Sequence, residues 1–214
     1  MTALLAGATG LVGREIATHW TGPGPLHLLV RRPLQPTHPL HRVHAVDFAA
    51  LPPLPQAEWA FCCLGTTIKA AGSQAAFRAV DHAAVLAFAR AAQQAGVTRF
   101  AVVSALGAST ASATFYNRVK GEMEAAVQTL GLQQLVIARP SLLAGDRAAL
   151  GQAARPGERL ALMLTAPLRP LIPKAWRPID AAVVARALLR AIRQGTPGVQ
   201  VLESAALQEL GGPG

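Results

Sequence analysis

The stretch GATGLVG, residues 7–13, decides the fold class of this 214-residue chain. It follows a short apolar run that suits a buried strand and precedes a helical pattern over residues 11–20. Three glycines at this spacing, between a strand and a helix, are typical of a loop that binds the pyrophosphate of a dinucleotide. Gly7 would allow the sharp turn, Gly10 the approach of the phosphates and Gly13 close packing of the helix on the strand. The loop alone also fits an ordinary tight turn.

Short apolar runs alternate with helical patterns along the rest of the chain. The runs predict strands at residues 2–6, 26–31, 43–46, 59–64, 99–104, 134–138 and 199–202, and the patterns predict helices at residues 11–20, 73–95, 113–130 and 180–193. Continuously apolar strands that alternate with helices are typical of parallel sheets covered on both faces. The sequence therefore predicts an α/β fold, a Rossmann-type doubly wound parallel sheet.

We expect residues 1–214 to form a single NAD(P)-binding domain, because this length suits one compact core. Residues 145–178 differ from the rest, with five prolines and no clear strand. This segment predicts a small C-terminal lobe on the substrate side, over the ends of the strands.

The composition narrows the classes of function. The chain carries a net charge of +9, with 51% apolar and 14% charged residues. Its arginines are scattered rather than clustered, so we expect no specific binding of nucleic acid. No apolar stretch is long enough to cross a membrane, and no basic segment precedes the first strand. The sequence therefore predicts a cytoplasmic protein that does not enter a membrane.

Cysteine and histidine, the usual ligands of zinc, do not form a convincing site. Cys62 and Cys63 are adjacent, so on a strand they would point to opposite faces, as buried thiols. His38, His41 and His44 recur every third residue, but a proline interrupts them and no fourth ligand is obvious. We interpret the histidines as part of a solvated loop and predict no metal site.

Two arginines follow the second predicted strand. Arg31 and Arg32 lie about 20 residues after the glycine loop, where the ribose 2′ position of a dinucleotide is expected. An acid there would favour the free hydroxyl of NAD, whereas arginine pairs with the 2′-phosphate of NADP. The sequence therefore predicts NADP(H) as the cofactor, preferred over NAD(H).

A phenol and an ammonium stand four residues apart in Tyr116-Asn117-Arg118-Val119-Lys120, on one face of a predicted helix. A neighbouring ammonium stabilises a phenolate, which lets the phenol exchange protons near neutral pH. Ser104 ends the fifth predicted strand, where its hydroxyl could hold the reacting oxygen. We predict Ser104, Tyr116 and Lys120 as catalytic residues; the alternative is an ordinary amphipathic helix.

Six stretches resemble the atypical short-chain dehydrogenases/reductases, and within them the Tat-interacting-protein-like branch. They are GATGLVGREI (7–16), VDF (46–48), FCCLGTT (61–67), FRAVDHAAVLAFARAAQQAGVTRFAVVSALGA (77–108), FYNRVKGEMEA (115–125) and ARPSLLAGDR (138–147). The resemblance runs over most of the chain, and FCCLGTT followed by YNRVKGEMEA is specific to this branch.

The resemblance implies which residues contact the cofactor. Asp47 and Phe48 would contact the adenine, and Lys120, beside Tyr116, would also hold the nicotinamide ribose. Leu64, Gly65 and Thr66 would line that ribose. The segment that would close over the nicotinamide comprises Arg139, Pro140, Ser141, Leu142 and Leu143. In the glycine loop the expected contacts are Gly7, Thr9, Gly10, Leu11, Val12 and Gly13.

The leading prediction is an NADP(H)-dependent oxidoreductase that exchanges hydride with a small, unidentified carbonyl or alcohol substrate. One alternative is a cofactor-sensing protein that controls a protein partner with little turnover, because relatives in the atypical group include regulators. Another is an epimerase or dehydratase that retains its cofactor, although members with sugar-nucleotide substrates carry a longer C-terminal lobe. We expect a monomer or weak homodimer.

Overall fold

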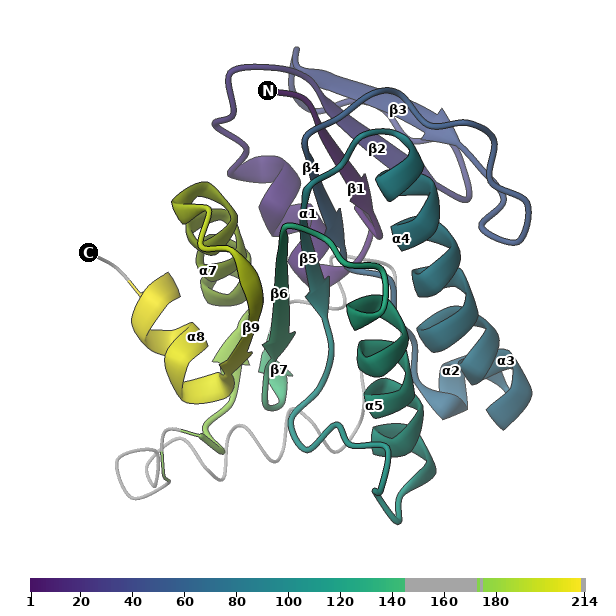
Figure 1. The fold of residues 1–214 in the computed structure, drawn as a ribbon, viewed down its shortest axis with the longest axis vertical. Helices are drawn as coiled ribbons and strands as arrows, with labels where there is room; N and C mark the ends of the chain where they lie inside the picture. The colour runs from purple at the N-terminus through teal and green to yellow at the C-terminus, as the bar shows by residue number, and fades with distance from the viewer. Residues whose placement is uncertain (145–172, 174, 213–214) are drawn as a thin grey trace.

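A computed structural model describes residues 1–144, 173 and 175–212 (Figure 1). The described residues form a seven-stranded sheet in the order β3-β2-β1-β4-β5-β6-β9, with every neighbouring pair parallel. The strands are β1 (Ala3–Ala6), β2 (Leu26–Val30), β3 (His41–Ala45), β4 (Trp59–Cys62), β5 (Arg99–Val103), β6 (Gln134–Arg139) and β9 (Gly198–Glu203). This arrangement confirms the predicted Rossmann-type fold class.

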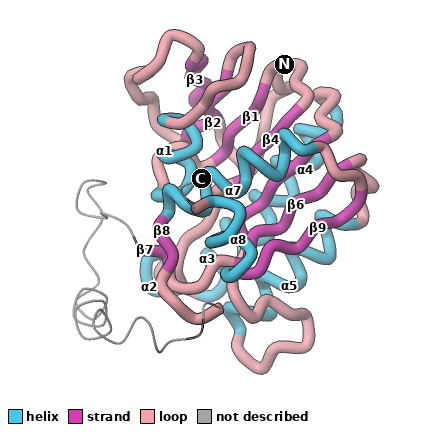
Figure 2. Tube along the Cα trace, turned by 90° about the vertical axis from the view of Figure 1, so that its left-hand side faces the viewer, coloured by secondary structure: helices cyan, strands magenta, loops and turns pink. Residues whose placement is uncertain are grey.

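Helices cover both faces of the sheet (Figures 1 and 2). One face packs against α1 (Leu11–Thr18), α7 (Ala181–Gln194) and α8 (Ser204–Gly211). The other face packs against α4 (Val85–Gln94) and α5 (Phe115–Gln128). Each face has its own apolar cluster, which explains why the central strands are apolar on both sides.

The strand order reverses between β1 and β4. From β1 the chain builds outward through β2 and β3, then returns to place β4 on the other side of β1. In open α/β sheets ligands bind at such a switch point, outside the carboxyl ends of the strands. The loops after β1, β2, β4, β5 and β6 all emerge at that edge.

Several elements were not predicted from the sequence. The helix expected over residues 73–95 is divided into α3 (Gln74–Arg78), a π-helical segment η1 (Ala79–Ala84) and α4, with a short α2 (Ile68–Ala71) before them. The helix α8 and the two-residue strands β7 (Leu143–Ala144) and β8 (Ile179–Asp180), which pair in parallel, were also missed.

Two sequence interpretations have other outcomes. The predicted lobe over residues 145–178 lies largely outside the described residues. The solvated-loop interpretation is wrong for His41, which begins β3, is 4% exposed and has its Nε2 3.2 Å from the carbonyl oxygen of Ala17. In the described part of the chain, no helix has the length and apolar character needed to cross a membrane.

Candidate functional site

The glycine loop is shaped by two positions that have no room for a side chain. Gly7 has a φ of +85°, and a Cβ there would lie 2.4 Å from the carbonyl oxygen of Cys63. A Cβ on Gly13 would lie 2.1 Å from the carbonyl oxygen of Gly7. The fold itself therefore requires glycine at both positions, as the sequence predicted for the turn and the helix packing.

Gly10 is different, because the fold leaves space around it. Its backbone is extended, and an added Cβ would come no nearer than 3.4 Å to another atom, the carbonyl oxygen of Gly7. Gly10 also precedes α1 as its N-cap, with no side-chain cap and no acid in the first turn. The N–H groups at this helix end thus retain their partial positive charge for an anion.

The other predicted contacts of the glycine loop differ in their exposure to solvent. Thr9 is exposed, whereas Leu11 and Val12 pack their side chains toward the apolar cluster under α1. Any contact of Leu11 and Val12 with a phosphate therefore falls to their backbone N–H groups. This matches the way helix N-termini bind anions.

Arg31 and Arg32 directly follow β2 and are both exposed. Because β2 lies beside β1, the two arginines share the sheet edge with the glycine loop. Among the described residues, neither arginine forms an ion pair. Their charges are therefore available to a ligand.

Asp47 and Phe48 follow β3. Asp47 is exposed, and its Oδ1 accepts a hydrogen bond of 2.9 Å from the Ala49 N–H. Phe48 is 7% exposed and its ring belongs to the apolar cluster on the α4 face of the sheet. Of the two side chains, only that of Asp47 is open to solvent.

The loop after β4 contacts a carboxylate that the sequence analysis did not identify. The Thr66 N–H donates a hydrogen bond of 2.8 Å to Oδ2 of Asp81, which lies in η1. A Cβ on Gly65 would lie 3.4 Å from Asp81 Oδ1 and 3.8 Å from Lys120 Nζ. The segment Leu64–Thr66 therefore lies directly against Asp81 and Lys120, as expected if it and Lys120 share one ligand.

Lys120 and Asp81 form a buried ion pair. Lys120 Nζ lies 2.7 Å from Asp81 Oδ1, and their side chains are 4% and 1% exposed. Burial lowers the pKa of Lys120, but the negative charges of Asp81 and of an ionised Tyr116 raise it, and the net direction is upward. Lys120 is therefore held in its charged form at neutral pH.

A helical-face analysis would have found Asp81. It shares one buried face with Phe77, Val85 and Phe88, each 0% exposed, at intervals of four, four and three residues. A carboxylate at such a position requires a partner, because an unpaired buried charge is costly. The sequence could therefore predict that Asp81 needs a partner, but it could not identify Lys120 as that partner.

Tyr116 and Ser104 complete the predicted catalytic set. The half-buried Tyr116 ring lies 5.3 Å from the ring centre of Phe77. Ser104 follows β5, is 5% exposed, and its Oγ has no hydrogen-bond partner among the described residues. A buried hydroxyl without a partner is rare in proteins, and a bound oxygen would satisfy it.

Close packing ties the loop after Ser104 to α5. A Cβ on Gly121 would lie 2.2 Å from the carbonyl carbon of Ser109, so this glycine lets the loop touch the helix backbone. The Ser109 N–H also donates a hydrogen bond of 3.1 Å to the carbonyl oxygen of Asn117. The loop that carries Ser104 is thus fixed to the helix that carries Tyr116 and Lys120.

The Arg139 side chain forms ion pairs with two glutamates. Its guanidinium binds Glu124 through two contacts of 3.0 and 2.6 Å and Glu203 through one of 3.0 Å. Hydrogen bonds to Glu124 raise the pKa of Arg139, which stays charged. Its side chain therefore joins α5, β6 and β9.

The residues after Arg139 continue along the same sheet edge. The Pro140 carbonyl oxygen accepts a hydrogen bond of 3.0 Å from the Leu106 N–H, two residues beyond Ser104. Leu142 is 40% exposed and Leu143 begins β7. Ser141 accepts a hydrogen bond of 3.0 Å from Ser204 Oγ. Contact of these residues with a cofactor remains a prediction.

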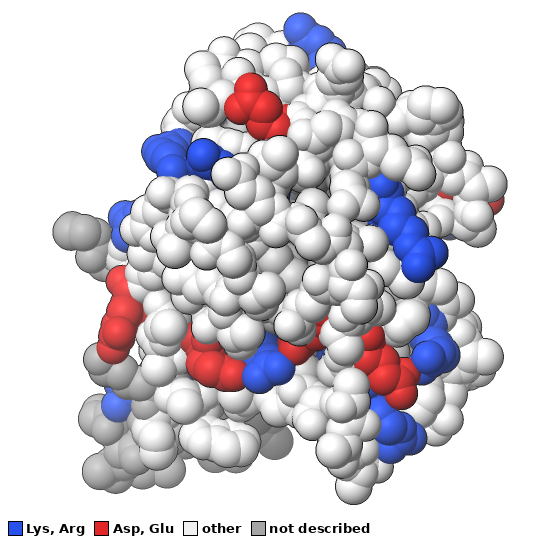
Figure 3. Space-filling view, in the orientation of Figure 1, with Lys and Arg blue, Asp and Glu red and all other residues white. Residues whose placement is uncertain are grey.

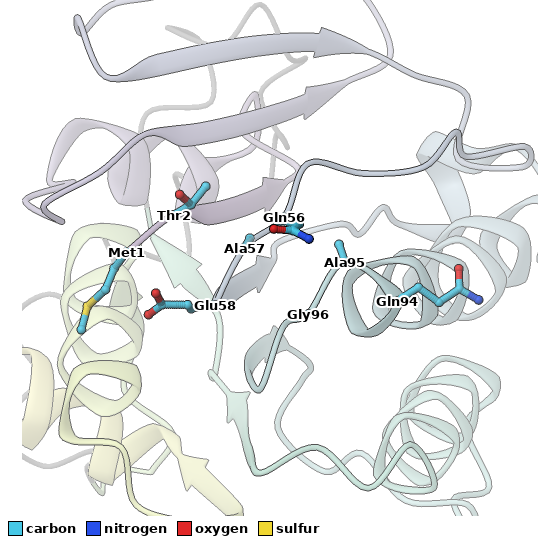
Figure 4. Close-up of a pocket in the computed structure, with 8 residues that line it drawn as sticks. All are labelled: Met1, Thr2, Gln56, Ala57, Glu58, Gln94, Ala95 and Gly96. Atoms are coloured by element: carbon cyan, nitrogen blue, oxygen red, sulfur yellow. The ribbon is translucent and has the colours of Figure 1, made fainter.

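The far end of the sheet holds a separate pocket of about 480 Å³ (Figure 4). It lies at the amino ends of the strands and is lined by Met1, Thr2, Gln56, Ala57, Glu58, Gln94, Ala95 and Gly96. None of the predicted site residues lines it.

The face shown in Figure 3 carries basic and acidic groups interspersed around a broad uncharged area, with no continuous basic patch.

Comparison with known proteins finds curated relatives that match this chain over much of its length. No family model matches the chain. The chain is 32% identical to the protein HTATIP2 of Rattus norvegicus, over 98% of this chain and 89% of that protein. It is 34% identical to the mitochondrial protein FMP52 of Coccidioides immitis, over 68% of this chain and 67% of that protein.

Solved structures share the fold at lower identity. MoeE5 in complex with UDP-glucose and NAD has a TM-score of 0.72 and 20% identity, over 94% of this chain and 75% of that one. WbmG of Bordetella bronchiseptica in complex with NAD has a TM-score of 0.67 and 16% identity, over 98% of this chain and 75% of that one.

The comparisons contradict one prediction. The sequence analysis expected a cytoplasmic protein, yet the FMP52 relatives are named mitochondrial. The expectation rested on composition and on the lack of the basic n-region of a secretory signal peptide, which bears on secretion and not on a mitochondrial location. The cytoplasmic prediction is therefore wrong.

Proposed function

Because this chain belongs to the family of atypical short-chain dehydrogenases/reductases that contains HTATIP2 and FMP52, we propose that it is an NADP(H)-dependent oxidoreductase acting on a small carbonyl or alcohol. The observation that carries the proposal is the buried Ser104 hydroxyl, which lacks a partner among the described residues. It lies at the sheet edge shared by the glycine loop, Tyr116 and Lys120.

The residues present suit a dinucleotide. Gly10 leaves space at an uncapped helix end, which would receive the pyrophosphate. Asp47 would face the adenine side, and Leu64–Thr66 and Lys120 would hold the nicotinamide ribose. Solved structures of this fold hold NAD. When bound, the nicotinamide supplies or accepts the hydride.

The chain's own residues would move the proton. Tyr116 would donate it to a carbonyl oxygen or take it from an alcohol, and Ser104 would hold that oxygen with a hydrogen bond. Lys120 would stabilise the phenolate through its charge. Phe77, which lies against the Tyr116 ring, would fix the phenol's orientation.

The preference for NADP(H) rests on Arg31 and Arg32. Both are exposed, unpaired among the described residues, and placed after the second strand. A charge-assisted pair with a 2′-phosphate contributes about 1.5–3 kcal/mol, or roughly tenfold to a hundredfold in affinity.

Calorimetric titration with NADPH and NADH tests the cofactor. NADPH should bind the wild type more tightly by about tenfold to a hundredfold, and the double variant Arg31→Ala/Arg32→Ala should lose that difference. Arg90→Ala, which removes an exposed arginine on α4, is the matched control. Equal affinities of the wild type for both cofactors would refute the preference.

A turnover screen tests the reaction class. NADPH oxidation is followed with aldehydes, ketones, quinones and UDP-glucose as separate classes of substrate. Turnover of a carbonyl compound supports the oxidoreductase. Tight NADPH binding without turnover of any class would favour the cofactor-sensing alternative instead.

A further inference from the structure

One carboxylate connects the two parts of the candidate site. Asp81 Oδ1 lies 2.7 Å from Lys120 Nζ on α5, and Asp81 Oδ2 accepts the hydrogen bond of 2.8 Å from the Thr66 N–H after β4. Asp81 is itself 0% exposed. The proton-transfer helix and the predicted ribose loop are therefore joined through this single side chain.

The backbone around Asp81 has an unusual form. Residues Ala79–Ala84 are π-helical, between the α-helical segments α3 and α4. Such turns are rare in proteins and frequently occur at functional sites. The π-helical segment is therefore the one that carries Asp81, the carboxylate paired with Lys120.

The charge balance explains what Asp81 does for Lys120. A buried ammonium without a counter-charge shifts toward its neutral form. The titratable groups that face Lys120 are Asp81 from η1, Tyr116 from its own helix and the Cys62 thiol from β4. Burial raises the pKa of Cys62 to about 12, so this thiol is neutral and supplies no counter-charge at neutral pH.

The neighbouring acids on α5 are already engaged. Glu124 binds Arg139, and Glu122 pairs with Arg78 on the exposed side of the helix. Of the carboxylates near this helix turn, Asp81 is thus the one within ion-pair distance of Lys120 in the described structure.

We propose that Asp81 is a positioning residue that keeps Lys120 protonated and fixed beside Tyr116, and that it acts on Tyr116 through Lys120. The assignment of Tyr116 and Lys120 to proton transfer rests on the proposed function. Asp81 itself touches neither reacting atom. Its effect is to make the ammonium a permanent part of the folded site, before cofactor or substrate arrives.

The composition provides a direct readout. Tyr116 is the only tyrosine in the chain, so the ultraviolet absorbance of tyrosinate during a pH titration reports on this phenol alone. In Asp81→Asn the side chain keeps its size and an oxygen for the Thr66 N–H but loses its charge. Lys120 should then be neutral when the phenol ionises, so the titration midpoint rises by about one pH unit or more.

Two further variants make the result specific. Glu122→Gln removes the same charge from the exposed pair on the same helix and should leave the midpoint unchanged. Lys120→Met should raise the midpoint as Asp81→Asn does, and adding Asp81→Asn to Lys120→Met should raise it no further. A midpoint that falls or stays constant in Asp81→Asn, or additive effects in the double variant, would overturn the proposal.

A measurement on the wild type covers the case in which Asp81→Asn does not fold. Lysine occurs only at positions 69, 120 and 174, so side-chain NMR of isotopically labelled lysine can follow Lys120 through a pH titration. Lys120 should stay protonated to higher pH than the exposed Lys69. Deprotonation of Lys120 before Lys69 would overturn the proposal.

Both titrations use the full chain without cofactor or substrate. Failure of NADPH to bind would refute the proposed function and leave these results readable. A normal NADPH affinity with an unshifted tyrosinate midpoint would refute only the role of Asp81.

Discussion

The glycine loop at residues 7–13 and the turn of α5 at Tyr116–Lys120 meet the same sheet edge by opposite means. The loop is built from backbone: two of its glycines are required because neighbouring carbonyl groups occupy the space of a side chain. The α5 turn is built from side chains, with a buried ammonium held by a buried carboxylate. The loop therefore depends on the absence of side chains at its glycines, and the α5 turn depends on a pair of opposite charges.

The two regions also differ in their electrostatics. Beside the loop, the N-terminus of α1 has no side-chain cap, and Arg31 and Arg32 have no ion-pair partner in the described structure. Beside α5, Lys120 is paired with Asp81 and Arg139 with Glu124. Positive charge is thus left open where an anion would bind and is balanced where a proton would move.

The largest expected effect is on the side-chain region. Tyr116→Phe keeps the ring and its contact with Phe77 but removes the transferable proton. Turnover of any accepted substrate should fall by about a hundredfold to ten-thousandfold, while NADPH affinity changes little. Steady-state kinetics and calorimetry on the same preparations measure both quantities. A variant with unchanged turnover would remove Tyr116 from the mechanism.

The next effect separates the glycines of the loop by stability. Gly13→Ala places a Cβ 2.1 Å from the Gly7 carbonyl oxygen, and the helix must move away. Its free energy of unfolding should fall by about 1–3 kcal/mol. In Gly10→Ala the nearest atom is 3.4 Å away, so stability should be nearly unchanged. Chemical denaturation compares them, and equal losses would contradict the distinction.

The sequence predicted the backbone device well because its signal is local. Glycine spacing between a strand and a helix fixes the loop, and apolar runs fix the strands to within about two residues. The short pair β7 and β8 and the helix α8 were missed because pairing and packing, rather than local periodicity, determine them.

The side-chain device could be predicted only in part. The spacing of Tyr116 and Lys120 is a local helical signal, and both lie on α5 as expected. Asp81 lies 39 positions before Lys120, and their contact depends on how η1 packs against α5. Likewise, the pairing of Arg139 with Glu124 is a tertiary contact between β6 and α5, which local sequence patterns do not indicate.

The smallest expected effect is the pH dependence of stability that a histidine pair on β2 and β3 causes. Burial, followed by the charge of His44, lowers the pKa of His27 from 6.5. His27 Nδ1 lies 2.8 Å from Nε2 of His44 on the neighbouring strand. The unfolded chain therefore binds a proton that the folded chain resists. The contribution of a neutral His27 to stability is therefore full above pH 6.5 and is lost as the pH falls below that value.

Replacing His27 with glutamine should reduce this acid loss by at most about 1 kcal/mol, whereas replacing the exposed His19 should not. Thermal denaturation at several pH values measures the difference. The same acid sensitivity in wild type and His27→Gln would place the responsible group elsewhere.

NADPH binding by Gly10→Val tests most directly the claim that the glycine loop holds a dinucleotide. The valine Cβ has space in the protein alone, but the branched side chain would project where the pyrophosphate must meet the backbone. Calorimetry should show micromolar or tighter binding to the wild type, at a Kd of about 1 μM or below, and none to a Gly10→Val variant with a wild-type circular dichroism spectrum. Normal NADPH affinity in that folded variant would contradict the claim and reduce the loop to a turn.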